Sequence, residues 1–326
     1  MDRRQFLKLS AILGGVGFVA GTTGYWAMFG NEGMNDLGRF ITSHYRKRKE
    51  VPLDKGLVDS HAHFSKHNNL QDLVNLVFDM DVFMQTISNR KQGVNYLTFE
   101  GFREGLSSLE GIEVVFQDKY AVVLRKEDQQ VVFTQSEEFE TEFDGSKKGL
   151  LRDHHEMHIV VEGFDDIKGE KSYDILKAAE MQGCPTTLAH PFTIPVRYIG
   201  FLPANDSEEQ NLEQACEDFD VFIEGGNSAN SLYMVGTNGE SRDFAERVDR
   251  PLIYSTDSHA REDLRLVRKQ VGRLGTLIPR FDVSEMDGRE MIRKKYELIK
   301  QEGEMYGLPM NTPTFFRIMV ATHLGI

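Results

Sequence analysis

Short apolar runs alternate with segments of helical apolar spacing along the chain from about Lys55 onward. Runs rich in Val, Ile, Leu and Phe between polar turns are typical of strands, whereas apolar residues repeated every three or four positions are typical of helices. The strand-like runs are GLVDSHAHF, DVFMQTIS, MHIVVEGF, TTLAHPF, FDVFIEGGN and PLIYSTDSHA, and the helix-like segments include NLQDLVNLVFDM, YDILKAAEMQ and RDFAERVD. Strands that alternate with helices predict a parallel sheet covered by helices. About seven such units in roughly 230 residues favour a barrel over an open sheet.

Three further stretches complete the predicted elements. FEGFREGLSSL predicts a helix, followed by the apolar run GIEVVF. YAVVLRK and QQVVFTQ, separated by polar residues, predict a β-hairpin inserted between the barrel strands. The acidic run EEFETEFD reads as a low-complexity segment, and Ser284 to Tyr306 predicts a charged amphipathic helix.

Polar residues gather where the predicted strands end. His61 and His63 end the first strand, His190 ends TTLA, Glu224 ends DVFI, and Asp257 and His259 end PLIYST. Residues two apart on a strand point to the same side, so His61 and His63 aim two imidazoles at one place. In barrels of alternating strands and helices, the chemistry lies at the carboxyl ends of the strands. Imidazole and carboxylate together suit Zn²⁺, Mn²⁺ or Fe²⁺ and do not suit Ca²⁺.

Composition and charge narrow the range of partners. Hydrophobic residues make up 40% of the 326-residue chain, enough for a sizeable core. The formal charge of −13 argues against general nucleic-acid binding, because an acidic chain repels phosphate backbones. A small anionic substrate stays compatible with this charge, since a metal ion inverts the local field. The two cysteines provide no disulfide framework and no CxxC site.

The N-terminus carries a targeting pattern. Arg3 and Arg4 begin RRQFLK, and a glycine-rich apolar run follows to about Phe29. This resembles a twin-arginine export signal, which implies recognition by the twin-arginine export machinery and a periplasmic or extracytoplasmic location. The apolar run also has the length of a membrane anchor, and no clean A-x-A site precedes Asn31, so inner-membrane anchoring of an uncut segment stays open. We predict a signal or anchor over 1–30 and a linker over 31–55.

The strand-end motifs resemble the PHP superfamily, named for polymerase and histidinol phosphatase domains. The resemblance covers roughly Leu57 to Thr276 and rests on H-x-H at 61–63, H-P at 190–191 and D-x-H at 257–259. It implies a distorted (βα)7 TIM-like barrel over 56–285, with 286–326 as a helical extension packed on it. It also implies phosphoester hydrolysis by two or three divalent metals acting on a small phosphorylated substrate. The ligands implied are His61, His63, Glu138, His158, His190, Asp257 and His259, with Glu137 and Glu140 as alternatives to Glu138.

One motif departs from that family. Ser88, Asn89 and Arg90 stand where T-D-H is usual, so the histidine expected to hold a third metal is missing. Arg90 is then a candidate fixed charge that binds phosphate, and Arg261 is a second candidate. His259 would protonate the leaving group if no third metal binds it. The departure also allows a metal-binding relative that has lost catalysis. An amidohydrolase-type enzyme is a further alternative, because that class also uses H-x-H, together with a bridging lysine.

Overall fold

The computed structural model describes residues 50–90, 95–142, 156–169, 171–191, 206–227, 235–258, 267–268 and 270–307. The predicted export segment lies outside these ranges, as does the linker up to residue 49. Within the described ranges, no helix is both long and apolar enough to cross a membrane. The strands are β1 Lys55–Asp59, β2 Val82–Arg90, β3 Glu113–Gln117, β4 Ala121–Lys126, β5 Gln129–Glu142, β6 Glu156–Glu162, β7 Thr186–Ala189, β8 Phe222–Asn227, β9 Leu252–Ser255, β10 Leu274–Pro279 and β11 Glu304–Gly307. The helices are α2 Leu70–Asp79, α3 Phe99–Gly105, α4 Ser172–Met181, α5 Asp206–Asp218, α6 Val235–Arg247 and α8 Gly288–Glu302, with a 3-10 turn at Leu106–Ser108.

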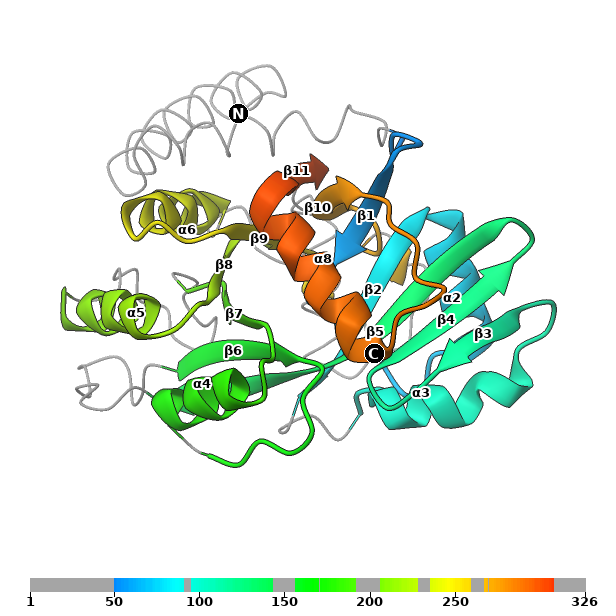
Figure 1. Cartoon of the computed structure of the whole chain (residues 1–326), viewed down its shortest axis with the longest axis horizontal. Helices are drawn as coiled ribbons and strands as arrows, with labels where there is room; N and C mark the ends of the chain where they lie inside the picture. Colours follow the sequence, from blue (N-terminus) through cyan, green and yellow to red (C-terminus); the bar gives the residue numbers. More distant parts are fainter. Residues whose placement is uncertain are drawn as a thin grey trace, which may run out of the picture.

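The sheet is a nearly closed barrel of mixed α/β type, consistent with the predicted TIM-like barrel. Its strand order is β11-β10-β1-β2-β5-β6-β7-β8-β9, and β3 and β4 extend from β5 (Figure 1). β9, the last strand in this order, approaches β1 just beyond the carboxyl ends of both strands. There Ala62 forms a parallel bridge with Ser258, and the His63 amide donates to the Ser258 carbonyl at 2.9 Å. The residues that follow β1 and β9 therefore lie side by side.

The expectation of an all-parallel sheet is wrong at β6, β10 and β11. β6 runs antiparallel to both β5 and β7, and β10 runs antiparallel to β1 and β11. Antiparallel neighbours need no crossover helix, and the sequence between β5 and β6, FDGSKKGLLRDHH, lacks helical apolar spacing. The reversal has a functional consequence: His158, near the start of β6, pairs with Ala189 at the end of β7.

The predicted hairpin insertion is also wrong in part. β4 and β5 do form an antiparallel hairpin, but β5 continues for 14 residues and pairs in parallel with β2, so it is a barrel strand itself. The part of the acidic run from Glu137 to Glu142 therefore lies within β5. Its alternation explains this: Phe139 belongs to the apolar cluster under α4, while Glu138 and Glu140, one position to either side, reach polar partners on the opposite face.

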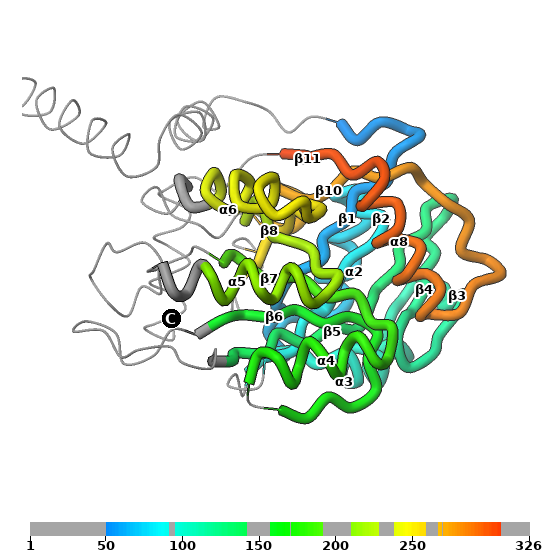
Figure 2. Tube along the Cα trace, turned by 60° about the vertical axis from the view of Figure 1, so that its left-hand side comes forward, coloured from blue at the N-terminus to red at the C-terminus, as the bar shows by residue number. Residues whose placement is uncertain are grey.

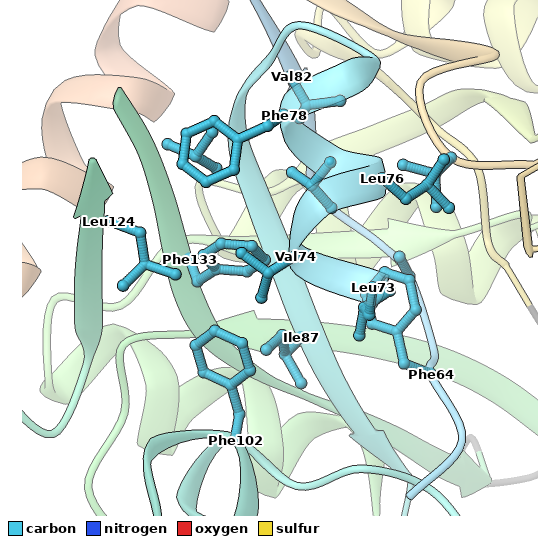
Figure 3. Packing of buried hydrophobic residues seen from close by; sticks show 14 of the residues in the cluster. Phe64, Leu73, Val74, Leu76, Phe78, Val82, Ile87, Phe102, Leu124 and Phe133 are labelled. Carbon is cyan, nitrogen blue, oxygen red and sulfur yellow. The ribbon is translucent and has the colours of Figure 1, made fainter. Parts of the chain in front are cut away.

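Helices cover the sheet in two groups. α2 and α3 pack on β2, β4 and β5 through a cluster that includes Phe64, Val74, Ile87, Phe102 and Phe133 (Figure 3). α4, α5 and α6 lie in series along β6, β7 and β8, and they share a second cluster (Figures 1 and 2).

α8 packs across one end of the barrel. Asp287 and Glu290 form a capping box that begins the helix. The helix ends at Glu302, short of the predicted Tyr306, because residues from Glu304 pair with β10. Its buried face reaches the start of β7, where Tyr296 lies 3.5 Å from the Thr187 hydroxyl. α8 thus lies at the end of the barrel opposite to the carboxyl ends of β1, β7 and β9.

Candidate metal centre

The hydrogen bonds of His61 and His63 fix which ring nitrogen faces the barrel interior. His63 Nδ1 lies 2.9 Å from the Ser88 carbonyl oxygen, which only accepts, so Nδ1 carries the proton. His61 Nδ1 lies 3.2 Å from Glu224 Oε1 and donates in the same way. Both rings therefore turn Nε2 inward, and the two Nε2 atoms lie 3.1 Å apart. Outer partners of this kind orient metal-binding histidines.

Four more predicted ligands converge on these two nitrogens. Glu138 lies at the centre, with Oε2 3.1 Å from His63 Nε2 and Oε1 2.6 Å from His158 Nδ1. His158 Nδ1 lies 3.3 Å from His190 Nε2, and Asp257 Oδ1 lies 3.5 Å from His61 Nε2. The ligand atoms form three overlapping groups, each within 4.8 Å, and these groups could hold metal ions: His61–His190–Asp257, His61–His63–Glu138 and Glu138–His158–His190. His61, His190 and Glu138 each belong to two of these groups, and Glu138 is the carboxylate among the three.

A bulge in β8 places a supporting carboxylate behind the ligands. Residues three apart on a regular strand point to opposite sides, but the pairing of β8 with β9 shifts between Glu224 and Gly226. The Asn227 amide can therefore donate to Glu224 Oε2 at 3.2 Å and to Asp257 Oδ2 at 2.8 Å. Glu224 Oε2 also accepts from the His190 backbone amide at 2.8 Å. One carboxylate thus contacts the two ligands His61 and His190.

Two of the predicted ligands have strained backbones. His190 has φ of 32° and Asp257 has φ of 43°, both in the left-handed region that side chains other than glycine rarely adopt. His190 follows directly after β7, and Asp257 lies two residues after the end of β9. In each case the turn redirects the side chain toward the cluster. Such conformations cost roughly 1–3 kcal/mol and concentrate at functional sites.

The electrostatics of the cluster favour a bound cation. Burial lowers the pKa of His61, but the carboxylates of Asp257 and Glu224 outweigh burial and raise it to about 10. Burial would raise the pKa of Glu138, yet His158 and Arg90 hold it well below its usual range. Burial lowers the pKa of His190, but the hydrogen bond with Glu138 and the carboxylates of Asp257 and Glu224 together outweigh burial, so its pKa is raised. The cluster therefore stabilises positive charge on its imidazoles when no metal is bound.

The donor set fits a divalent metal better than a proton. A metal about 2.0–2.1 Å from each nitrogen sets neighbouring donors roughly 3 Å apart, which matches the 3.1 Å between the two Nε2 atoms. Glu138 Oε2 is buried and makes no hydrogen bond within the described part of the chain, although His63 Nε2 lies 3.1 Å away. Arg90 Nε lies 3.5 Å from the same oxygen and supplies one positive charge, and a metal ion or a proton on His63 Nε2 would supply another. Imidazole and carboxylate donors suit Zn²⁺, Mn²⁺ or Fe²⁺.

Exposure shows from which side the cluster is reached. The side chains of His61, His63 and Glu138 are at most 2% exposed, whereas His158 is 16% and His190 is 12% exposed. Arg90, the last residue of β2, is 23% exposed and lies beside Glu138. A ligand therefore reaches the cluster over His158, His190 and Arg90.

The remaining predicted site residues have different placements. His259 and Arg261 lie outside the described residues, so their proposed roles stay predictions. Glu140 forms a close ion pair with Arg90 and belongs to none of the three ligand groups. Glu137 lies 3.5 Å from the Asn89 amide instead. Of the three glutamates considered for the bridge, Glu138 has the bridging geometry.

Sequence reasoning assigned no role to three residues around the cluster. Glu224 was visible as a strand-end carboxylate, and the glycine pair after it in EGGN indicates an irregular strand. Asn227 became relevant only through the resulting bulge. Tyr96, whose ring centroid lies 5.2 Å from that of His63, carried no sequence signal.

Known proteins resemble this chain in fold and not in sequence. No family model matches the chain, and no curated protein matches it significantly. The crystal structure of PsfC from Pseudomonas syringae has 14% identity and a TM-score of 0.52, covering 84% of this chain and 100% of PsfC. A two-domain protein from Bacteroides vulgatus, described as containing a predicted PHP-like metal-dependent phosphoesterase, has 14% identity and a TM-score of 0.50, covering 84% of this chain and 74% of that protein. These likenesses support the barrel fold of the chain.

Proposed function

We propose that this chain is a metal-dependent hydrolase of phosphate esters that uses two divalent ions at the open end of the barrel. The observation that carries the proposal is the convergence of five ligand side chains, from the ends of β1, β7 and β9 and from the start of β6, on a shared carboxylate, Glu138 of β5. The fold likeness to a protein described as containing a predicted PHP-like phosphoesterase supports the same class of reaction. The substrate expected is a small phosphorylated molecule, and no nucleic acid is expected.

Charge balance supports both the number of ions and the sign of the substrate. The carboxylates of Glu138, Glu140, Glu224 and Asp257 outnumber the guanidinium of Arg90 by three negative charges when the histidines are neutral. One divalent ion would leave this group negative and hostile to phosphate. Two divalent ions would make it positive by one charge, which attracts an anionic ester.

Different residues would hold the metal ions and orient the ligands. When bound, a pair of divalent ions supplies Lewis acidity for the phosphoryl group and for an attacking water. His61, His63 and Asp257 would hold one ion, His158 and His190 the other, and Glu138 would bridge them. Glu224 and Asn227 keep the ligands oriented, as outer partners do at other metal sites.

Two charged residues and one proton donor complete the proposal. Arg90 lies at the mouth of the cluster, where a guanidinium can bind two phosphoryl oxygens at once. Arg261 is proposed as a second phosphate contact and His259 as the residue that gives a proton to the leaving group. Arg90 also places a permanent positive charge where the PHP pattern has the histidine that would bind a third metal. We therefore propose two metals rather than three.

Two alternatives make different predictions. A relative that binds metal without catalysis is favoured by Ser88–Arg90, whose side chains bind other protein groups: Ser88 Oγ lies 2.7 Å from Ser136 Oγ. An amidohydrolase would need a lysine among the ligands. In the part of the chain that the structure describes, the buried lysine, Lys295, contacts Glu162 at the other end of the barrel.

Hydrolysis of aryl phosphates by the metal-loaded protein tests the proposal. We expect turnover that chelation abolishes and that added Mn²⁺ or Zn²⁺ restores, with aryl esters of carboxylic acids as the control substrates. Metal binding without turnover on a broad phosphoester panel would favour the non-catalytic relative. Cleavage of the carboxylic esters or of amides alone would favour the amidohydrolase.

We also propose that the chain is exported by the twin-arginine route and acts outside the cytoplasm, either free or anchored to the inner membrane. The support is the RRQFLK motif and the apolar run that follows it. Replacing Arg3 and Arg4 with Lys should retain the protein in the cytoplasm, as measured by cell fractionation. Unchanged export of that variant would refute this route.

A further inference from the structure

The guanidinium of Arg90 lies at the mouth of the cluster between two carboxylates. Its Nε is 3.5 Å from Glu138 Oε2, and it forms a close ion pair with Glu140. The β2–β5 register explains the first contact, because Arg90 is paired directly with Glu138. Glu140 is two residues further along the same strand and therefore on the same face. At 23% exposure Arg90 is accessible from outside, while the Glu140 side chain is 8% exposed.

Tyr96 lies close to His63, one of the ligands of the cluster. Its ring centroid is 5.2 Å from that of His63. The segment around it is fixed to the chain after β1, because the Lys66 amide donates to the Asn95 carbonyl at 2.9 Å and the Leu97 amide to the Phe64 carbonyl at 2.7 Å. Burial lowers the pKa of Arg90, but its neighbours outweigh burial and raise it, Glu138 and Glu140 most strongly and Tyr96 to a smaller extent. Arg90 thus stays charged, with a phenol nearby.

We propose that Arg90 and Tyr96 form the subsite for the non-bridging oxygens of the phosphoryl group, and that Glu140 occupies this subsite as an internal anion until the substrate displaces it. The inference rests on the proposed function and adds to it a residue that sets substrate affinity. A carboxylate and a phosphate present similarly spaced oxygens to the planar fork of a guanidinium, so they compete for the same donors.

Glu140 is the carboxylate that can leave. Glu138 belongs to two ligand groups and would be held by the metals, whereas Glu140 belongs to none of the groups among the described residues. Displacement of Glu140 therefore costs an ion pair and no metal ligand. Once two divalent ions are bound, an arriving phosphate satisfies Arg90 in place of Glu140.

The test measures the affinity of inorganic phosphate for the metal-loaded full chain by calorimetry, with metal content determined on each sample. Glu140→Gln should tighten phosphate binding about two- to fivefold, the scale of a partly exposed ion pair, at unchanged metal content. Arg90→Met should weaken binding about tenfold or more, because a charge-assisted contact is lost. Tyr96→Phe should weaken it by a smaller factor. Glu137→Gln is the matched control: it removes the same charge three residues away and should change nothing.

A double-mutant cycle separates competition from a general field effect. If Glu140 acts through Arg90, the gain from Glu140→Gln should vanish in the Arg90→Met background. A gain that persists there, or that Glu137→Gln reproduces, overturns the inference. Loss of metal in Glu140→Gln also overturns it, because Glu140 would then be a ligand. If the wild type binds phosphate and Glu140→Gln behaves identically, the subsite inference falls while the proposed function stands. Metal-loaded wild type that neither binds phosphate nor hydrolyses aryl phosphates removes both.

Discussion

The two ends of the barrel both bury carboxylates, and they differ in where the neutralising charge comes from. At the end covered by α8, Glu162 accepts hydrogen bonds from Lys295 Nζ at 2.7 and 2.5 Å, from the Tyr296 hydroxyl at 2.7 Å and from Thr134 Oγ1 at 3.1 Å. Both oxygens of this carboxylate are thus used. At the open end, Glu138 and its neighbours surround imidazoles whose lone pairs face one another.

This difference separates a structural cluster from a functional one. Lys295 Nζ contacts both oxygens of Glu162, so the closed end contains its own cation, supplied by the chain, although burial lowers the pKa of Lys295. The open end contains a surplus of carboxylates and two strained ligands, and it stabilises protons on histidines that ordinarily titrate near pH 6.5. A buried polar group that lacks its partner within the chain indicates a partner from outside. The predictions below separate the two ends.

The largest effect should come from removing the first two ligands. His61→Ala with His63→Ala should lower metal affinity by more than roughly 100-fold, beyond what loss of an orienting partner alone causes, and should abolish turnover. Metal content and aryl-phosphate hydrolysis measure this. Full activity without bound metal would contradict the scheme.

Removing the Lys295–Glu162 ion pair under α8 should lower the stability of the fold and leave metal binding unchanged. Lys295→Met leaves Glu162 buried without its cation and should cost about 3–5 kcal/mol of unfolding free energy, measured with urea. Metal content of the folded fraction should be unchanged. The matched double variant Lys295→Met/Glu162→Leu should recover much of the loss, because a buried ion pair can be replaced by apolar groups. Loss of metal in the single variant, without loss of stability, would mean that the two ends are not separate.

Removing the support behind the ligands should have an intermediate effect. Glu224→Gln keeps the side-chain volume but weakens the hold on His61 and His190, so metal affinity should fall about 10- to 100-fold. Chelator competition measures this. Glu217→Gln, the same change at an exposed position of α5, is the matched control and should behave as wild type. Unchanged affinity in Glu224→Gln would show that the bulge of β8 has no role in metal binding.

Metal binding should also depend on pH. The pKa of His61 is raised to about 10 in the metal-free protein, so its stabilising effect is complete below about pH 6.5 and is lost as the pH rises through about 10. A metal must displace this proton. Metal affinity should therefore rise about tenfold per pH unit between pH 7 and 9 for each proton released. Competition titrations across this range measure the slope, and a flat profile would contradict a protonated His61.

The sequence allowed prediction of those parts of the site that depend on local periodicity. Two histidines two residues apart after an apolar run point the same way, and strand ends converge in a barrel, so His61, His63, His190 and Asp257 could be grouped before the structure was known. The direction of β6 could not, because a strand pattern is the same in both directions. The acidic part of β5 was misread for a related reason: its apolar positions are few, and burial of Glu138 depends on partners from other strands.

The features that the sequence did not predict depend on contacts between residues far apart in the chain. The bulge that brings Asn227 to Glu224 arises from pairing with β9, and the Lys295–Glu162 pair joins residues 133 positions apart. Neither follows from a local pattern. The Arg90–Glu140 pair depends on the β2–β5 register, which was unknown while β5 was read as an insertion.

Elemental analysis of the full chain, purified without chelators from a native-like preparation, tests most directly whether the open end takes its cations from outside. Two divalent metal ions per chain are predicted for the wild type, with the Lys295→Met/Glu162→Leu variant equally loaded and the His61→Ala/His63→Ala variant depleted. Wild-type protein that contains no metal, and takes up none when Zn²⁺, Mn²⁺ or Fe²⁺ is supplied, would contradict the account.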